Sequence, residues 1–315
     1  MMKTSILTLL LSGFLVTACN PTPEIDDLTM LDGDQIFDLS LTQPEKYLVS
    51  VYLPNPTDVQ KNIPVLIAAH GYSASTFEWD EMREYADSKG TFLVSQVLLG
   101  GHGRSYADFK KASWKDWQSS IVDEFNKLHS KGFRNIYLVG SSTGAPLILQ
   151  LISEGFFSNQ KAPKGIFLVD PIVVSSNKTL TLMGVLGPVL GYTTTDLDDG
   201  EKGKWYVYRP QESLKQLLQL TNITRKDLEN GMKLPEGCMA KIYKSIIDRT
   251  ADPVSASLIH RGLRKFDGKT IQVEMFDSEL HVMTRLRGRE NISSKDVLLQ
   301  RQIFADMESI MQGEN

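Results

Sequence analysis

The chain has 315 residues, of which 41% are hydrophobic and 23% are charged, so it can bury a sizeable core. Its formal net charge is −4 and no basic cluster stands out, which argues against a nucleic-acid partner. Its two cysteines, Cys19 and Cys238, cannot form a disulfide framework, and no spacing typical of a metal site is present.

The first 18 residues are typical of a secretory signal, because their apolar stretch is too short for an ordinary membrane span. Residues 16–19 read VTAC and resemble the lipobox of bacterial lipoproteins, in which the cysteine is lipidated. The resemblance implies a signal peptide over 1–18 and a lipid anchor on Cys19; a plain signal-peptidase site is the alternative. A polar, acidic segment over 19–34 is typical of a flexible tether. Asn20 takes the place of the aspartate linked to inner-membrane retention, which favours the outer membrane.

The remainder, 35–315, is expected to be one α/β domain. Apolar runs and alternating patterns predict strands, in chain order, over 46–54, 63–71, 91–99, 135–139, 165–170, 241–247 and 270–276. Helical spacing predicts helices over 75–88, 113–132, from 144 onward, and over 211–220, 254–265 and 295–311. This order favours a mostly parallel sheet with helices on both faces. The rhythm breaks over about 173–239, which we expect to be a cap inserted after the sixth strand.

One turn carries a candidate nucleophile. Residues 140–144 read GSSTG, which fits the pattern G-x-S-x-G with Ser142 at its centre. A buried strand precedes this stretch and a helix follows it, as a strained nucleophile turn requires. Ser141 would then bond or pack locally. The alternative is a glycine-eased turn whose hydroxyls cap the helix.

A serine hydroxyl needs a base to accept its proton. In folds with this turn the histidine follows the serine in the chain, which leaves His260 and His281. His260 falls within a predicted helix, whereas His281 follows the last predicted strand, so we take His281 as the base. His70 precedes the serine and is expected to brace a loop.

The carboxylate that orients the histidine should follow a strand between Ser142 and His281. Asp252 is the leading candidate, and Asp248 and Asp170 remain alternatives. Two amides should stabilise an oxyanion: that of Thr143, at the start of a helix, and that of Tyr72, beside Gly71 in the loop after 63–70.

Several motifs together resemble the α/β-hydrolase family of bacterial carboxylesterases and monoacylglycerol-lipase-like enzymes. In chain order they are HGY (70–72), GGHGRS (100–105), W-x-x-W (114–117), GSSTG (140–144), ADPVS (251–255) and SELHVM (278–283). The resemblance implies that the cap shapes an acyl pocket. It also implies the roles already assigned to Ser142, Asp252, His281, Tyr72 and Thr143.

The expected activity is therefore hydrolysis of carboxylic esters, with a small-molecule substrate and no cofactor. An aminopeptidase or amidase of the same fold is one alternative. A catalytically silent surface lipoprotein is another, although the set of candidate groups in the correct order argues against it.

Overall fold

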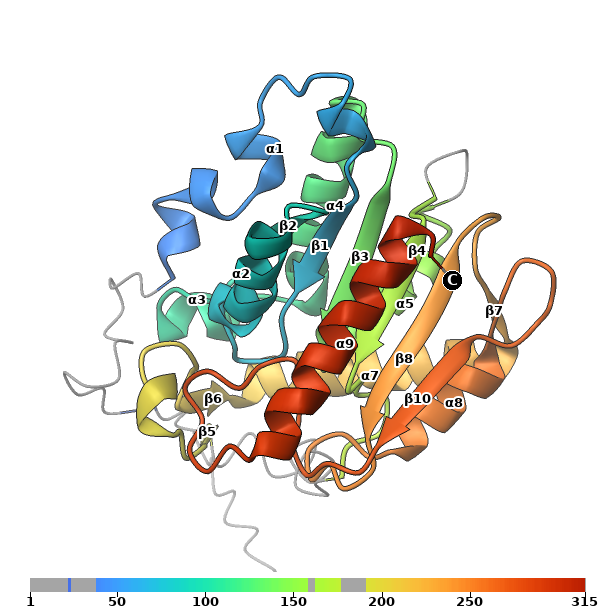
Figure 1. The fold of residues 1–315 in the computed structure, drawn as a ribbon. Helices are drawn as coiled ribbons and strands as arrows, with labels where there is room; N and C mark the ends of the chain where they lie inside the picture. Colours follow the sequence, from blue (N-terminus) through green and yellow to red (C-terminus); the bar gives the residue numbers. More distant parts are fainter. Residues whose placement is uncertain (1–21, 24–37, 158–161, 177–190, 315) are drawn as a thin grey trace, which may run out of the picture.

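The computed structural model describes residues 22–23, 38–157, 162–176 and 191–314. At its centre is a sheet of six parallel strands in the order β10-β8-β4-β3-β1-β2 (Figure 1). The strands are β1 (Val65–Ala69), β2 (Leu93–Val97), β3 (Ile136–Ser141), β4 (Gly165–Val169), β8 (Met239–Ser245) and β10 (Gln272–Phe276). Six of the seven predicted strands are therefore confirmed, with ends shifted by a few residues.

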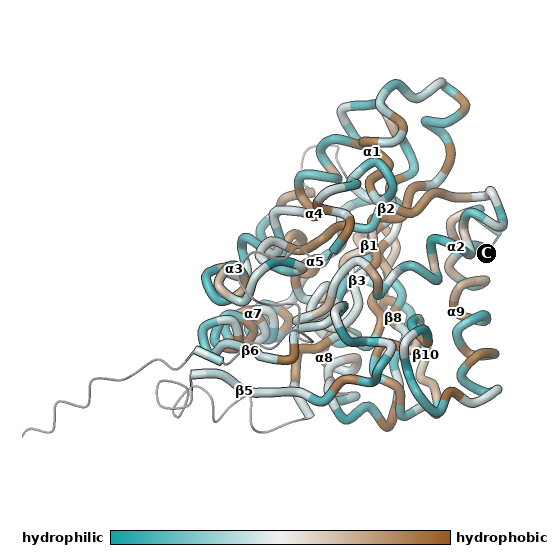
Figure 2. Tube along the Cα trace, turned by 90° about the vertical axis from the view of Figure 1, so that its left-hand side faces the viewer, coloured by the Kyte–Doolittle hydropathy of each residue, from teal (hydrophilic) through white to brown (hydrophobic). Residues whose placement is uncertain are grey.

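Helices cover both faces of this sheet. The helices of the described residues are α1 (Val49–Tyr52), α2 (Asp80–Lys89), α3 (Tyr106–Lys111), α4 (Trp114–Ser130), α5 (Gly144–Ser153), α7 (Gln211–Asn230), α8 (Val254–Gly262) and α9 (Ser294–Gln312). Figure 2 shows α2 and α9 on one side of the strands and α4 and α5 on the other. The predicted α/β architecture is confirmed.

The strands are apolar throughout because both faces are buried. In β1, Val65, Ile67 and Ala69 enter the core formed with α4, α5, α7 and α8. Leu66 and Ala68 enter a second core, formed with α2 and α9. All five side chains are fully buried. Burial on both faces of the sheet explains why the pattern over 63–71 is continuously apolar and not alternating.

The prediction of a strand over 46–54 is wrong. Residues Val49–Tyr52 form the short helix α1. The Val49 amide donates to Ser95 Oγ at 3.1 Å, and the Ser50 amide donates to Glu124 Oε1 at 3.1 Å. Side chains of β2 and α4 thus satisfy amides that would otherwise need a neighbouring strand.

The cap follows β4, the fourth strand of the sheet in chain order, so its predicted place after the sixth strand is also wrong. The predicted strand over 46–54 does not join the sheet, which accounts for one of the two strands by which the predicted position differs. The described part of the cap contains β5 (Tyr192–Thr194), β6 (Tyr208–Pro210) and α7, which is longer than the predicted 211–220.

Short elements complete the described chain. They are β7 (Met232–Lys233), β9 (Leu263–Arg264), η1 (Leu39–Leu41), η2 (Pro44–Lys46), η3 (Gln60–Asn62), η4 (Thr76–Trp79) and η5 (Asp199–Glu201). Within the described residues, no helix combines the length and hydrophobicity that a membrane span requires. The predicted signal peptide, Cys19 and most of the predicted tether lie outside the described residues.

Candidate active site

Ser142 lies in a strained turn between β3 and α5. Its φ is 47°, in the left-handed region that residues other than glycine seldom adopt. The glycines on either side leave no room for a side chain: a Cβ on Gly140 would lie 2.5 Å from the Gly144 carbonyl carbon. A Cβ on Gly144 would lie 2.4 Å from the Ala69 carbonyl oxygen. Close backbone packing therefore requires both glycines of the motif.

The neighbouring Ser141 faces away from this site. Its side chain is fully buried, and its hydroxyl donates to Glu78 Oε1. The same hydroxyl lies 3.3 Å from the Ala69 carbonyl oxygen. Ser141 is thus bonded locally, as predicted, and Ser142 is the serine of this turn that reaches the cavity described below.

Asp248 is the carboxylate that orients His281. The Nδ1 atom of His281 lies 2.8 Å from Asp248 Oδ2. Asp252, the predicted partner, instead accepts the Val254 amide at 2.8 Å at the start of α8. The prediction of Asp252 is therefore wrong: the two aspartates follow the same strand, and the one four residues further on is used to begin a helix.

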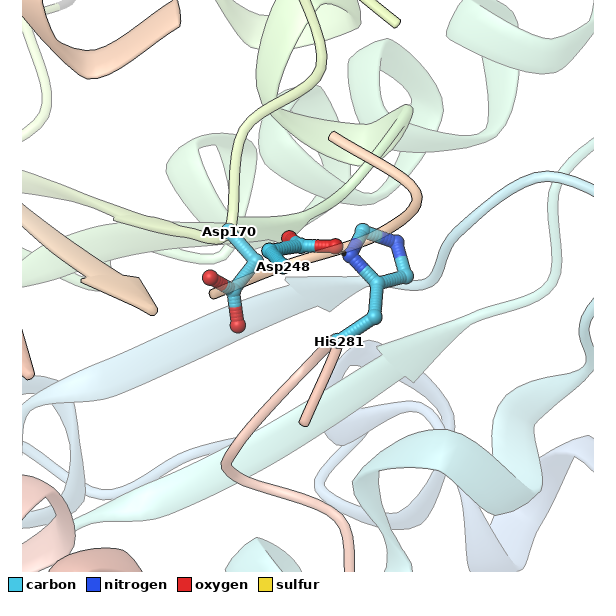
Figure 3. A group of neighbouring side chains, drawn as sticks. All are labelled: Asp170, Asp248 and His281. Atoms are coloured by element: carbon cyan, nitrogen blue, oxygen red, sulfur yellow. Dashed lines mark hydrogen bonds and ion pairs between the residues drawn. The ribbon is translucent and has the colours of Figure 1, made fainter. Parts of the chain in front are cut away.

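A buried lysine joins this pair to Asp170. Lys244 is fully buried, and its Nζ lies 3.0 Å from Asp170 Oδ1 and 2.5 Å from Asp248 Oδ2. Asp170 follows β4 with a φ of 44°, and its Oδ1 also accepts the Ser245 amide at 2.8 Å. Figure 3 shows the two carboxylates side by side, with the His281 ring next to Asp248. Asp170 is thus part of the network. Within the described residues, however, the hydrogen bond to the His281 ring comes from Asp248 and not from Asp170.

Burial alone raises the pKa of the Asp248 carboxyl, but the His281 hydrogen bond and the charges of His281 and Lys244 outweigh it and lower that pKa to about 2. Asp248 is therefore ionised at neutral pH. Asp170, Asp248 and His281 offer ligand atoms within 4.8 Å of one another, a spacing that also suits a metal ion. Because the Lys244 ammonium already contacts both carboxylates, the cluster is an ion-pair network and calls for no metal.

The two predicted oxyanion donors belong to residues that line the same cavity as Ser142. Among the described residues, the amides of Tyr72 and Thr143 donate no hydrogen bond, so both are available to a ligand. Thr143 is the N-cap of α5, whose dipole favours negative charge at that end. The Gly71 amide donates to Glu78 Oε1 at 2.8 Å, which holds the turn that carries Tyr72.

Two buried histidines brace this loop. His70 Nε2 accepts the Leu99 amide at 3.1 Å, and His102 Nε2 accepts the Ser73 amide at 3.3 Å. Burial lowers the pKa of both imidazoles, so both rings are neutral and accept these bonds. The prediction that His70 braces a loop is confirmed.

Ser142, His281, Tyr72 and Thr143 line one cavity of about 690 Å³. The structure gives no hydrogen bond between Ser142 and His281 within its described residues; such bonds are often long in free enzymes and tighten when substrate binds. The cap supplies part of the wall, and its apolar contribution comes from Leu197, Trp205, Leu214 and Leu217. The volume is within the range of small-molecule sites.

No family model matches the chain. It is 25% identical over 226 residues to a thermostable monoacylglycerol lipase of Bacillus sp. (strain H-257), a match that covers 71% of this chain and 85% of the relative. Among solved structures, it resembles a metagenome-derived lipolytic enzyme with a TM-score of 0.62 and 17% identity, over 79% of this chain and 94% of the other. It also resembles a soluble variant of the monoglyceride lipase of Saccharomyces cerevisiae, with a TM-score of 0.62 and 14% identity, over 80% and 87% of the two chains.

The chain has the α/β-hydrolase fold. In this hydrolase fold, the nucleophile turn follows a central strand, and acid and histidine come later in the chain. Ser142, Asp248 and His281 occur in that order, on the loops after β3, β8 and β10. Because parallel strands end at the same edge of the sheet, three segments far apart in sequence meet at one cavity.

The interpretation of the sequence ranked Asp248 below Asp252 and did not recognise Lys244. Asp248 lies only three residues after the end of β8, whereas Asp252 lies seven residues after it. Closeness to the strand end is the signal that could have identified Asp248. Lys244 lies one residue before the end of β8, where the structure buries it fully, and a buried lysine needs partners. Cys238 is buried, and burial raises the pKa of its thiol to about 12, which is typical of an inert packing residue.

Proposed function

We propose that the protein is a serine hydrolase that cleaves carboxylic esters with aliphatic acyl groups, of the monoacylglycerol type. The observation that carries the proposal is the strained Ser142 turn in one cavity with His281, whose ring is hydrogen-bonded to the buried Asp248. The similarity to a monoacylglycerol lipase over 71% of the chain supports the substrate class.

In the proposed reaction, His281 Nε2 takes the proton of the Ser142 hydroxyl as its oxygen attacks the ester carbonyl carbon. The tetrahedral oxyanion accepts hydrogen bonds from the Tyr72 and Thr143 amides. The imidazolium then protonates the leaving alcohol, and an acyl-enzyme forms. Water deprotonated by His281 attacks this acyl group and releases the acid, which regenerates the free serine.

Asp248 has two effects in this scheme. Its hydrogen bond to Nδ1 holds His281 in the tautomer whose Nε2 is free to accept a proton, and its charge stabilises the imidazolium. The ion pair with Lys244, which also contacts Asp170, holds the Asp248 carboxylate in place. The scheme requires no cofactor.

The test is an active-site label with a matched pair of serine variants. A fluorophosphonate probe should label the wild type and Ser141→Ala but not Ser142→Ala. Ser142→Ala should also lose about 10⁶-fold in kcat for a 4-nitrophenyl ester, the order seen when a triad serine is removed. Equal labelling of both variants would contradict the assignment of Ser142.

A substrate panel separates the ester proposal from its enzymatic alternative. 4-Nitrophenyl esters of increasing acyl length and a monoacylglycerol should be hydrolysed, whereas aminoacyl 4-nitroanilides should not. Faster cleavage of the anilides would favour an aminopeptidase or amidase. A folded wild type that neither reacts with the probe nor cleaves any substrate would favour a catalytically silent protein.

We also propose that Cys19 is lipidated after removal of residues 1–18, and that the enzyme is anchored to the bacterial outer membrane. The VTAC pattern before the polar tether supports this location. A single acyl chain binds membranes only marginally, whereas two or more anchor stably. A lipid-anchored enzyme would meet lipid-derived esters at the membrane surface.

A further inference from the structure

Two arginines in the wall of the cavity have no acidic partner. Arg209 lies in β6 of the cap, and Arg289 lies in the segment between β10 and α9. Among the described residues, no carboxylate oxygen comes within 4.0 Å of either guanidinium. Their neighbour Arg285 differs, because it pairs with Glu201 at 2.6 Å.

These two guanidinium groups lie next to residues of the candidate site. The Arg209 guanidinium carbon lies 5.8 Å from the centre of the Tyr72 ring, whose residue supplies a proposed oxyanion donor. Arg289 donates from Nη2 to the carbonyl oxygen of His281, the proposed base. One positive charge thus lies near the Tyr72 ring and the other at the backbone carbonyl of His281.

Both arginines are held partly out of water. The Nε atom of Arg209 is buried and has no hydrogen-bond partner. Burial, with a contribution from the charge of Arg285, lowers the pKa of Arg289 to about 10, and burial also lowers that of Arg209. An unpaired cation in such surroundings is unfavourable unless a ligand supplies the opposite charge.

Nearby carboxylates attract the two arginines only from beyond ion-pair distance. Glu201 attracts both guanidinium groups, and Glu78 and Asp170 attract that of Arg289. Glu201 is paired with Arg285, and Glu78 accepts hydrogen bonds from the Gly71 amide and the Ser141 hydroxyl. Asp198 accepts the Glu290 amide. The other acidic side chains of the wall are exposed to water, which screens them; they are Asp196, Glu279 and Glu290.

We propose that Arg209 and Arg289 bind an anionic group of the substrate, so that the preferred substrate is an ester that also carries a carboxylate, phosphate or sulfate. This inference rests on the proposed ester hydrolysis and narrows its substrate class. Guanidinium groups recognise these anions through paired, charge-assisted hydrogen bonds. The cavity of about 690 Å³ holds an ester together with such a group.

Two pairs of esters test the proposal and locate the charge. 4-Nitrophenyl hemiglutarate and 4-nitrophenyl pentanoate have the same chain length and differ in a carboxylate on the acyl side. A 1-acylglycerol 3-phosphate and the matching 1-acylglycerol differ in a phosphate on the alcohol side. For at least one pair, we expect kcat/KM of the wild type to be about 10-fold or more higher for the anionic ester.

Arg209→Gln and Arg289→Gln should each lower that preference about 10-fold or more, mainly through KM of the anionic ester, because a charge-assisted hydrogen bond is lost. Arg249→Gln is the matched control: it removes an arginine of the same wall whose charge is already paired with Glu279. We expect it to leave the preference unchanged.

The outcomes separate this inference from the proposed function. If the wild type hydrolyses the neutral esters and prefers neither anionic ester, the anion site is wrong and ester hydrolysis stands. If it hydrolyses none of the four, the proposed function itself fails. The comparison in the wild type needs no substitution, so it decides the question even where an arginine variant does not fold.

Discussion

Replacing Lys244 by methionine tests the buried network beneath the candidate active site. Its ammonium lies 3.0 Å from Asp170 Oδ1 and 2.5 Å from Asp248 Oδ2, and all three side chains are buried. At an effective dielectric constant of about 20, each attraction is worth about 5–7 kcal/mol before the cost of desolvation. Measured losses on breaking a buried pair are about 3–5 kcal/mol, and we expect Lys244→Met to lose that much stability.

The assay is urea and thermal unfolding at neutral pH. A loss of this size should lower Tm by about 5–8 °C in a chain of this length. Lys241→Met is the matched control, three residues earlier on the same strand. Lys241 pairs with Glu274 and Asp306, but its side chain is 12% exposed and its partners are more so. Its loss should therefore be smaller, about 1 kcal/mol.

A double variant identifies the cause. Lys244→Met leaves two carboxylates facing each other without a counter-charge, and adding Asp170→Asn removes one of them. The double variant should recover part of the lost stability, although an asparagine cannot accept from both the Ser245 and Met283 amides as Asp170 does. Wild-type stability in Lys244→Met, or no recovery in the double variant, would refute the reasoning.

Four further results are expected. Asp248→Asn should lower kcat about 10⁴-fold by favouring the wrong histidine tautomer, whereas Asp252→Asn should retain most activity; the reverse would restore Asp252 as the acid. Because the pKa of Asp248 is lowered from 3.8 to about 2 in the folded state, its stabilising effect should be complete above about pH 4 and lost between pH 4 and 2. Unfolding measured against pH should show this slope, and Asp248→Asn should remove it. Gly144→Ala should abolish activity or folding, because its Cβ would lie 2.4 Å from the Ala69 carbonyl oxygen, and circular dichroism beside activity distinguishes the two. Cys19→Ser should release the protein from membranes or stall its processing; mass spectrometry of an unmodified wild-type N-terminus would contradict lipidation.

Local patterns determined most of the architecture. Continuous apolar runs indicated six strands of the sheet, because a strand buried on both faces has no polar position. The turn at Ser142 could also be predicted, since a strained turn needs small residues within two positions of the serine, and Gly140 and Gly144 stand there. The strand predicted over 46–54 was wrong because its backbone partners are not visible in the local sequence. The amides of Val49 and Ser50 donate to Ser95 and Glu124, which are distant in sequence. The alternating pattern of 46–54 therefore does not indicate these partners.

The identity of the acid and the charges around it depended on tertiary structure. Asp248 and Asp252 follow the same strand, and only the path of that loop brings one of them to His281. Lys244 became part of the site because β8 lies beside β4, and Asp170 directly follows β4. Arg209 and Arg289 come from the cap and from the segment before α9, and their convergence on one cavity is a property of packing between elements. Sequence periodicity reports which face of an element is buried, whereas the partners of a buried charge are decided by elements that meet only in the folded chain.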